Sequence, residues 1–223
     1  MSLISRFCFL LVLTGFVFLT SCSTFNFTPK TATIYHVVAH KPHDSSRVRV
    51  DVSLSKQNVY VMEGNRCLMA VATSVGLNQH PTPKGHFHIT NKIENKRSGA
   101  YGFRVQGEHV VAADAGAHVP GKYVGYPMGY WCEFAPGYGF HQGFVHPVPR
   151  THGCLRLHGE AAPKFFALVH EGTPVNIANT QPEDAAIGPK VERVDDSKSP
   201  DPDPALEITS GAFQKPTGAL LVE

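Results

Sequence analysis

A cysteine and a histidine that lie close together in this sequence have the side chains needed for covalent acyl transfer. Cys154 sits in the run Thr151-His152-Gly153-Cys154-Leu155-Arg156-Leu157, and His141 lies ten residues before that run begins. A thiol becomes a strong nucleophile when a base takes its proton, and an imidazole suits that task at neutral pH. The sequence therefore predicts Cys154 as the nucleophile and His141 as the general base and acid, with the imidazole taking the proton and holding the resulting ion pair.

The residues beside this cysteine suit the stabilisation of a tetrahedral intermediate. Gly153 has no side chain, so the N–H groups of Gly153 and Cys154 are predicted to bind the developing oxyanion, with His152 in a supporting role. A guanidinium group presents a planar fork of donors that matches a substrate carboxylate. The predicted substrate-binding residues are Arg156, Gln142 and Thr151.

Each of these assignments has an alternative. Cys154 could be an inert buried thiol and His141 a structural residue. His146 could act as the base in place of His141, and Arg156 could serve only a surface ion pair.

The sequence predicts no metal and no other cofactor. A zinc site built from Cys154, His141 and His152 is an alternative to the nucleophile assignment. His86 and His88 alternate along one expected strand, but no third ligand follows at a suitable spacing. We therefore interpret these two histidines as solvent-facing.

The first residues have the layout of an export signal. Residues 1–6 carry one positive charge, and residues 7–19 form an apolar run. Thirteen helical residues rise about 20 Å, which is short of the roughly 30 Å hydrocarbon core of a bilayer. A cleaved signal peptide over residues 1–21 is therefore expected, and an uncleaved anchor helix is the alternative.

The end of this run resembles the lipobox of bacterial lipoproteins. Leu19-Thr20-Ser21-Cys22 places a cysteine directly after the apolar stretch. The resemblance implies cleavage before Cys22, lipidation of that residue and anchoring to a membrane. The expected location is the cell envelope on the periplasmic side, at the outer membrane if the cell is Gram-negative, because Ser23 rather than Asp follows.

Charge and cysteine content narrow the class of partner. Residues 22–180 hold 15 lysines and arginines against 9 acidic residues, and residues 181–223 hold 4 against 9. The mildly basic body suits an anionic peptide polymer. The sequence contains no dense basic patch with interleaved aromatic residues, so nucleic acid is not expected as a partner. Loss of residues 1–21 and lipidation of Cys22 would leave three cysteines, an odd number that requires a free or intermolecular thiol.

The chain divides into a tether, a folded body and a tail. Residues 22–46 are polar and predicted to form a lipid-anchored tether, 47–178 the catalytic domain, and the Pro-rich acidic residues 179–223 a disordered tail. Residues 98–140 are rich in Gly and Tyr and are expected to form loops and short strands. Alternating apolar residues predict strands over 48–54, 58–62, 68–75, 86–90 and 173–177, and one helix is expected over 159–170.

Six segments of this body resemble segments of the L,D-transpeptidase catalytic domain and follow one another in the same order. They are residues 50–61, the Pro-Thr-Pro-Lys-Gly-His-Phe stretch within 80–89, the aromatic run 127–134, Phe140-His141-Gln142-Gly143, residues 151–157, and Glu171-Gly172-Thr173-Pro174-Val175. The resemblance implies a mainly β fold, a sandwich or pair of mixed sheets with one helix after the cysteine. It also implies that the Gln142 carbonyl fixes the tautomer of His141.

The resemblance implies chemistry on peptidoglycan peptide stems. Cys154 would attack the carbonyl of the third residue of a tetrapeptide stem, expel the terminal D-Ala and form a thioester. An amine of another stem would then give a 3→3 cross-link; water instead would give an L,D-carboxypeptidase, and an amine on a protein a protein-to-peptidoglycan ligase. The departures from the family pattern are Thr151 in place of Ser, the short Pro-rich gap after His141, and Gln142.

Two further classes of function compete with this interpretation. A papain-like endopeptidase would place its cysteine before its histidine, and here the order is reversed. A non-catalytic wall-binding lipoprotein would not need Cys154, His141 and Arg156 to be present together.

Overall fold

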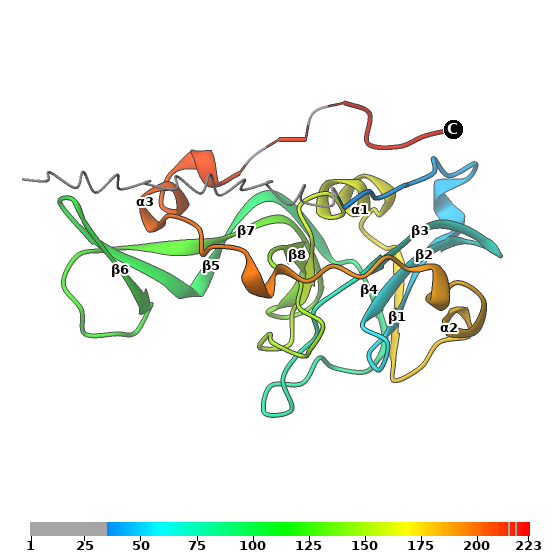
Figure 1. Ribbon diagram of the computed structural model, residues 1–223, viewed down its shortest axis with the longest axis horizontal. Coiled ribbons are helices and arrows are strands. Elements are labelled where there is room, and N and C mark those ends of the chain that lie inside the picture. The colour runs from blue at the N-terminus through cyan, green and yellow to red at the C-terminus, as the bar shows by residue number, and fades with distance from the viewer. Residues whose placement is uncertain (1–34, 214, 217) are drawn as a thin grey trace, which may run out of the picture. The chain divides into compact units, whose positions relative to one another are not determined.

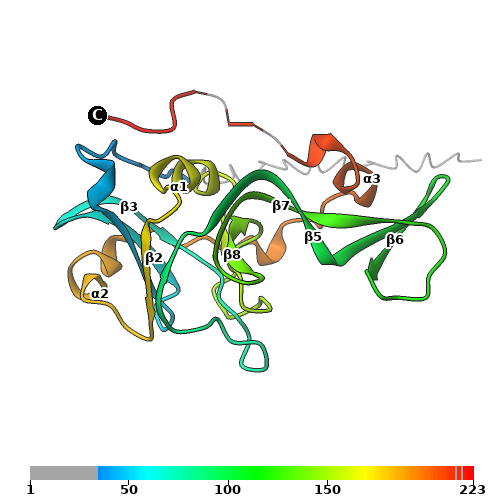
Figure 2. The same cartoon turned by 180° about the vertical axis from the view of Figure 1, so that it is seen from behind.

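Two five-stranded sheets form the framework of the fold (Figures 1 and 2). The computed structural model describes residues 35–213, 215–216 and 218–223, so the predicted signal peptide and Cys22 lie outside the described residues. The first sheet has the order β3-β2-β1-β10-β4, with β1 Val48–Ser53, β2 Asn58–Glu63, β3 Arg66–Ala72, β4 Gly85–His88 and β10 Pro174–Ala178. The second has the order β6-β5-β7-β8-β9, with β5 Asn91–Gln106, β6 His109–Asp114, β7 Lys122–Ala135, β8 Tyr138–Gln142 and β9 Leu155–Leu157. The prediction of a mainly β fold is confirmed.

The first sheet is organised around β1. Val48, Val50 and Val52 alternate along this strand and are fully buried, as the period-two pattern predicts. β1 pairs antiparallel with β2 and parallel with β10, so the strand that follows the cysteine segment returns to the first strand of the sheet. The segment between β9 and β10 is therefore held at both ends, by the pairing of β9 with β8 and by the pairing of β10 with β1.

The second sheet is longer than the sequence indicates. Residues 98–140 were expected to form loops and short strands, but β5 and β7 run as 16- and 14-residue strands paired antiparallel. The glycines serve close strand packing: a Cβ on Gly102 would lie 2.3 Å from the Val124 carbonyl oxygen, and one on Gly125 would lie 1.9 Å from that of Ser98. They cluster where the β5–β7 register shifts, between Arg97 and Gly102.

One apolar core joins both sheets to the helix α1, Ala162–Leu168. This helix follows the cysteine segment, as predicted, and its Phe165 ring lies 4.5 Å from that of Phe140 in β8. Lys92 of β5 donates to the carbonyls of Phe166 and Val169, at 2.7 and 2.6 Å, where the helix ends. Among the described residues, no helix has the length and apolar character needed to cross a membrane.

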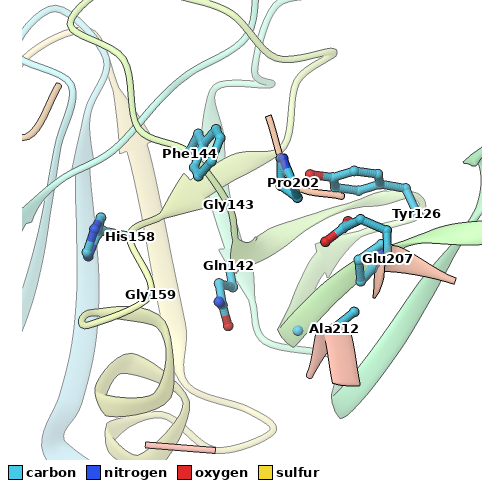
Figure 3. Close-up of a pocket in the computed structure, with 11 residues that line it drawn as sticks. Tyr126, Gln142, Gly143, Phe144, His158, Gly159, Pro202, Glu207 and Ala212 are labelled. Carbon is cyan, nitrogen blue, oxygen red and sulfur yellow. The ribbon is translucent and has the colours of Figure 1, made fainter. Parts of the chain in front are cut away.

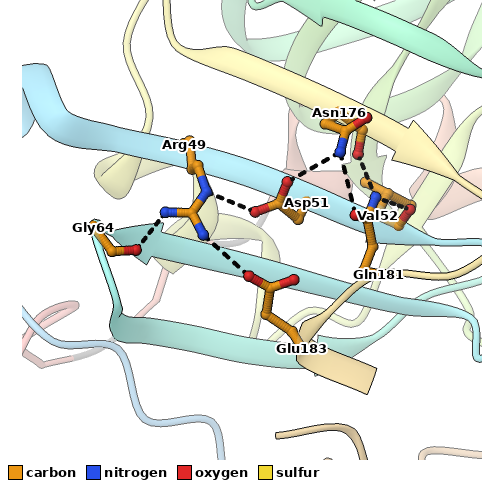
Figure 4. A network of polar contacts seen from close by, with 7 residues as sticks. All are labelled: Arg49, Asp51, Val52, Gly64, Asn176, Gln181 and Glu183. Atoms are coloured by element: carbon orange, nitrogen blue, oxygen red, sulfur yellow. Dashed lines mark hydrogen bonds and ion pairs between the residues drawn. The ribbon is translucent and has the colours of Figure 1, made fainter. Parts of the chain in front are cut away.

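The tail predicted to be disordered is folded against the first sheet. Gln181 donates to the carbonyls of Val52 and Asn176, each at 3.0 Å, and Glu183 pairs with Arg49 at 3.0 Å (Figure 4). Glu183 begins the first of five short helices in this tail, which are α2 Glu183–Ala186, η2 Gly188–Lys190, η3 Asp196–Lys198, α3 Pro204–Glu207 and η4 Ser210–Ala212. Buried polar contacts hold this segment, and so does Val191, which is buried in an apolar cluster with Tyr60 and Met62 of β2.

The described part of the predicted tether, residues 35–46, also packs on the domain. Tyr35, Val37 and Ala39 are buried in the core. Val222 donates to the Ala39 carbonyl at 2.8 Å and accepts from the Lys41 N–H at 2.7 Å. Residues on both sides of the predicted catalytic domain 47–178 therefore pack against it. The short 3-10 turn η1, Ser45–Arg47, leads from the N-terminal segment into β1.

Candidate active site

Two adjacent parallel strands bring the predicted nucleophile and base together. His141 lies in β8, and Cys154 immediately precedes β9. The strands pair in parallel, with His141 opposite Arg156. All three side chains line one cavity, whose walls are formed by Ser98, Tyr101, Tyr126, Met128, His141, Thr151, His152, Cys154 and Arg156. We call it the thiol cavity.

The orientation of His141 leaves one ring nitrogen available as a base. Its Nδ1 lies 2.8 Å from the Gln142 carbonyl oxygen, which can only accept, so Nδ1–H is the donor. Nε2 of the neutral ring then carries the lone pair. Burial lowers the pKa of His141 from 6.5 to about 4, against the opposing effect of this hydrogen bond. The imidazole is therefore neutral at physiological pH.

Cys154 rests as a thiol rather than as a thiolate. Its Sγ lies 3.7 Å from the Gly137 carbonyl oxygen, to which it donates. Burial raises the pKa of Cys154, although a backbone contact from Gly139 and the positive charge of Arg156 oppose the rise. Both groups are buried, and burial favours their neutral forms, so the predicted ion pair would have to form when the thiol gives its proton to His141.

Thr151 braces the turn that presents the thiol. Its Oγ1 donates to the Cys154 carbonyl at 2.6 Å and accepts from the Gly153 N–H at 3.1 Å. Gly153 has φ +106°, and a Cβ there would lie 2.4 Å from the Tyr138 ring. One prediction needs correction: the Gly153 N–H is engaged within the turn, which gives Gly153 a supporting role and leaves the Cys154 N–H as the predicted oxyanion donor.

The segment that follows β3 holds this turn in place. Arg156 and Ser74 exchange backbone hydrogen bonds at 3.1 and 3.2 Å. The N–H groups of Arg150 and Thr151 both donate to the Val75 carbonyl, at 2.9 and 3.0 Å. Backbone from the first sheet therefore supports the cysteine turn of the second.

His152 is held at the mouth of the site by two aromatic rings. It stacks on Tyr101 at a centroid distance of 5.0 Å and 18° between planes, and the His80 ring lies 4.7 Å away. Its side chain is exposed, which fits a supporting role. Neither Tyr101 nor His80 was predicted as a site residue, although His80 begins the segment 80–89 that resembles the family.

A second cavity adjoins the thiol cavity and contains charges of both signs. The two share Tyr126 and Arg156, and the second also contains Arg150 and His146. His146, the alternative base, is thus in this neighbouring cavity. Its remaining wall includes Asp196, Asp201, Pro202 and Glu207. We call residues 196–213 the C-terminal wall.

A third cavity continues along the same wall (Figure 3). Gln142 lines it opposite Glu207, and Tyr126 and Pro202 are shared with the second cavity. Gln142 therefore has two contacts at the site, since its carbonyl holds His141 while its side chain faces this cavity. The C-terminal wall could not be found from the sequence, because its acidic residues are interrupted by prolines and match no motif.

Metal ligation is the alternative role for Cys154, His141 and His152. Within residues 35–213, 215–216 and 218–223, no group of three or more His, Cys, Asp or Glu side chains is arranged to hold a metal ion. In the same residues, Cys67, Cys132 and Cys154 are free cysteines. Burial raises the pKa of Cys132 to about 12.

Two mixed sheets that present a cysteine and a buried neutral histidine in one cavity define a candidate cysteine acyltransferase. The profile of the L,D-transpeptidase catalytic domain (YkuD) matches residues 47–177. The chain belongs to this family.

Solved structures similar to the chain include three L,D-transpeptidases. They are from Mycobacterium smegmatis (15% identity, TM-score 0.46, 59% of this chain and 58% of that one), Stackebrandtia nassauensis (19%, 0.45, 69% and 63%) and, as L,D-transpeptidase 1, Mycobacterium tuberculosis (20%, 0.44, 59% and 61%). The chain therefore spans less than two thirds of each. No curated protein matches it.

Proposed function

We propose that this protein is a cysteine L,D-transpeptidase that cross-links peptidoglycan stems. The observation that carries the proposal is the shared cavity of Cys154 and His141, in which the Gln142 carbonyl holds Nδ1 and leaves Nε2 as a base. Membership of the L,D-transpeptidase family supports the same chemistry. The proposed product is a 3→3 cross-link between two stems.

In the proposed first step, Cys154 is acylated by a tetrapeptide stem. The thiol leaves the Gly137 carbonyl and turns toward His141, and Nε2 takes its proton as sulfur attacks the carbonyl of the third residue. A C–S bond forms and the C–N bond to the terminal D-Ala breaks. The imidazolium returns the proton to the leaving amine, so the thioester forms with both side chains uncharged.

In the proposed second step, a neutral amine of another stem attacks the thioester carbonyl. Its nitrogen forms the new amide bond, the C–S bond breaks, and His141 carries the proton from nitrogen to the departing sulfur. The Cys154 N–H is proposed to stabilise the tetrahedral oxyanion in both steps. Arg156, half-buried beside the thiol, is proposed to bind a substrate carboxylate.

The proposed setting is the cell envelope. The apolar run 7–19 and Cys22 support export and lipid anchoring, and both lie outside the described residues. Radiolabelled palmitate incorporation into the full chain tests this, with Cys22→Ala expected to lose the label. Label retained by that variant would contradict lipidation at Cys22.

Acylation by a carbapenem tests the nucleophile directly. Intact-mass spectrometry should detect one adduct on the wild-type protein and none on Cys154→Ser. Cys67→Ser is the matched control, because it removes another free, partly buried thiol and should keep the adduct. An adduct that survives Cys154→Ser would refute the assignment.

The cross-link itself requires a second assay. Cells that express the wild type should contain 3→3 dimers in digested walls, and cells that express Cys154→Ala should lose them. Unchanged dimers, with both proteins present in equal amounts, would refute the proposed function.

A further inference from the structure

The C-terminal wall is attached to the catalytic domain at two points. Near its start, Asp196 and Val145 exchange two hydrogen bonds, with the Val145 N–H donating to Asp196 Oδ2 at 2.8 Å and the Asp196 N–H donating to the Val145 carbonyl at 2.9 Å. Farther along, the Arg97 guanidinium donates to the carbonyls of Glu207 and Thr209 at 2.8 and 2.7 Å. The wall is thus a fixed part of the cavities.

Glu207 contributes an unsatisfied buried carboxylate to this wall. The residue is 8% exposed, and among the described residues none donates a hydrogen bond to its buried Oε2. Arg97 is nearby, but its guanidinium donates to backbone carbonyls. Burial raises the pKa of Glu207, and the charge of Arg97 opposes the rise. A buried carboxylate without a partner is costly, so a ligand that donates to it would relieve that cost.

The carboxylate lines cavities that adjoin one another, and one of them adjoins the thiol cavity. Figure 3 shows it facing the cavity between Tyr126 and Gln142. Glu207 also lines the second cavity, which shares Tyr126 and Arg156 with the thiol cavity. Burial raises the pKa of Tyr126, the charge of Glu207 adds to the rise, and the charge of Arg156 opposes it, so both charges act on this ring. A ligand group at Glu207 is therefore one cavity away from the thiol.

We propose that Glu207 binds the ammonium group of the acyl acceptor, a peptide whose side chain ends in a primary amine. An ammonium has three donors and no acceptor, which matches an unsatisfied carboxylate. The scissile bond of the donor must lie at Cys154, so the group held in the adjoining cavities belongs to the acceptor. The inference rests on the proposed function and favours transfer to an amine over hydrolysis. The amine docks at Glu207 as the cation. It then gives one proton to solvent, leaves Glu207 for the adjoining thiol cavity, and attacks the thioester carbonyl as the neutral amine.

Glu207→Gln tests the proposal, because it keeps the size of the side chain and removes its charge. Purified tetrapeptide stem serves as donor and acceptor, and mass spectrometry counts cross-linked dimer and hydrolysed tripeptide. Transfer to the stem amine should fall roughly tenfold to a hundredfold, the usual loss when a hydrogen bond to a charged group is removed. Release of D-Ala in a single turnover should stay within twofold of the wild type. Glu192→Gln, an exposed acid outside the C-terminal wall, is the matched control and should change neither rate.

Hydroxylamine separates charge recognition from general damage. It is an uncharged nucleophile at neutral pH, so hydroxamate formation should be equal in wild type and Glu207→Gln. If Glu207→Gln transferred the acyl group to the stem amine as fast as the wild type does, the role of Glu207 would be overturned. The same would follow if D-Ala release, transfer to the stem amine and transfer to hydroxylamine all fell equally. Absence of any thioester in the wild type would instead refute the proposed function itself.

Discussion

Acid should destabilise this protein through His141. The side chain is 6% exposed, and burial lowers its pKa to about 4, against 6.5 in an unfolded chain. Below pH 6.5 the unfolded chain binds a proton that the folded protein does not bind. The contribution of His141 to stability is therefore complete above pH 6.5 and is lost as the pH falls toward 4.

The two pKa values set the expected size of this loss. One pKa unit corresponds to about 1.4 kcal/mol, so the linkage relation gives a loss of about 2 kcal/mol at pH 5 and about 3 kcal/mol at pH 4. Other groups titrate in the same range, so the wild type alone is not informative. The contribution of His141 is the difference in pH dependence between wild type and His141→Gln.

Urea unfolding at pH 7 and pH 5 measures this difference. The free energy of unfolding of the wild type should fall by about 2 kcal/mol more than that of His141→Gln. His109→Gln removes an exposed histidine at the start of β6 and should behave as the wild type. If His141→Gln lost as much stability as the wild type, the buried imidazole would not be the source.

Other variants test the turn and the wall. Gly153→Ala should cost roughly 2–4 kcal/mol of unfolding free energy in urea, because φ is +106° and a Cβ would collide with Tyr138. Thr151→Val should cost about 1–3 kcal/mol, since two buried hydrogen bonds of the cysteine turn are lost, and a stability equal to the wild type would contradict that role. Arg97→Met should release the C-terminal wall and give new trypsin cleavage within residues 196–213. Carbapenem acylation should keep its rate down to about pH 5 if the pKa of His141 governs it.

Patterns of neighbouring residues in the sequence were sufficient to predict strands of the first sheet and to name the pair of candidate catalytic residues. Valine alternation along β1 predicted the buried face. Residue type and family resemblance named His141 and Cys154 as a pair, and both line the thiol cavity. Both features depend on residues near in sequence. The Gly- and Tyr-rich stretch 98–140 was misjudged, because its glycines allow two long strands to approach rather than marking loops.

The C-terminal segment could not be predicted, because its contacts, both polar and apolar, are with residues far away in the sequence. Pro and acidic residues indicate disorder when apolar burial is the only stabilisation considered. Here Gln181 and Glu183 satisfy groups of the first sheet, more than a hundred residues away in sequence. The protonation states at the site were also beyond the sequence, since the low pKa of His141 comes from burial in the folded chain.

The attachment of the C-terminal wall has a consequence for the order of assembly. Val145 and Arg97 are synthesised long before Asp196 and Thr209, their partners in the wall. Both catalytic strands can thus pair while one side of the neighbouring cavities is still open. A nascent chain that stops before Asp196 would carry the thiol and the imidazole without the acidic surface beside them, so the enzyme gains that surface last.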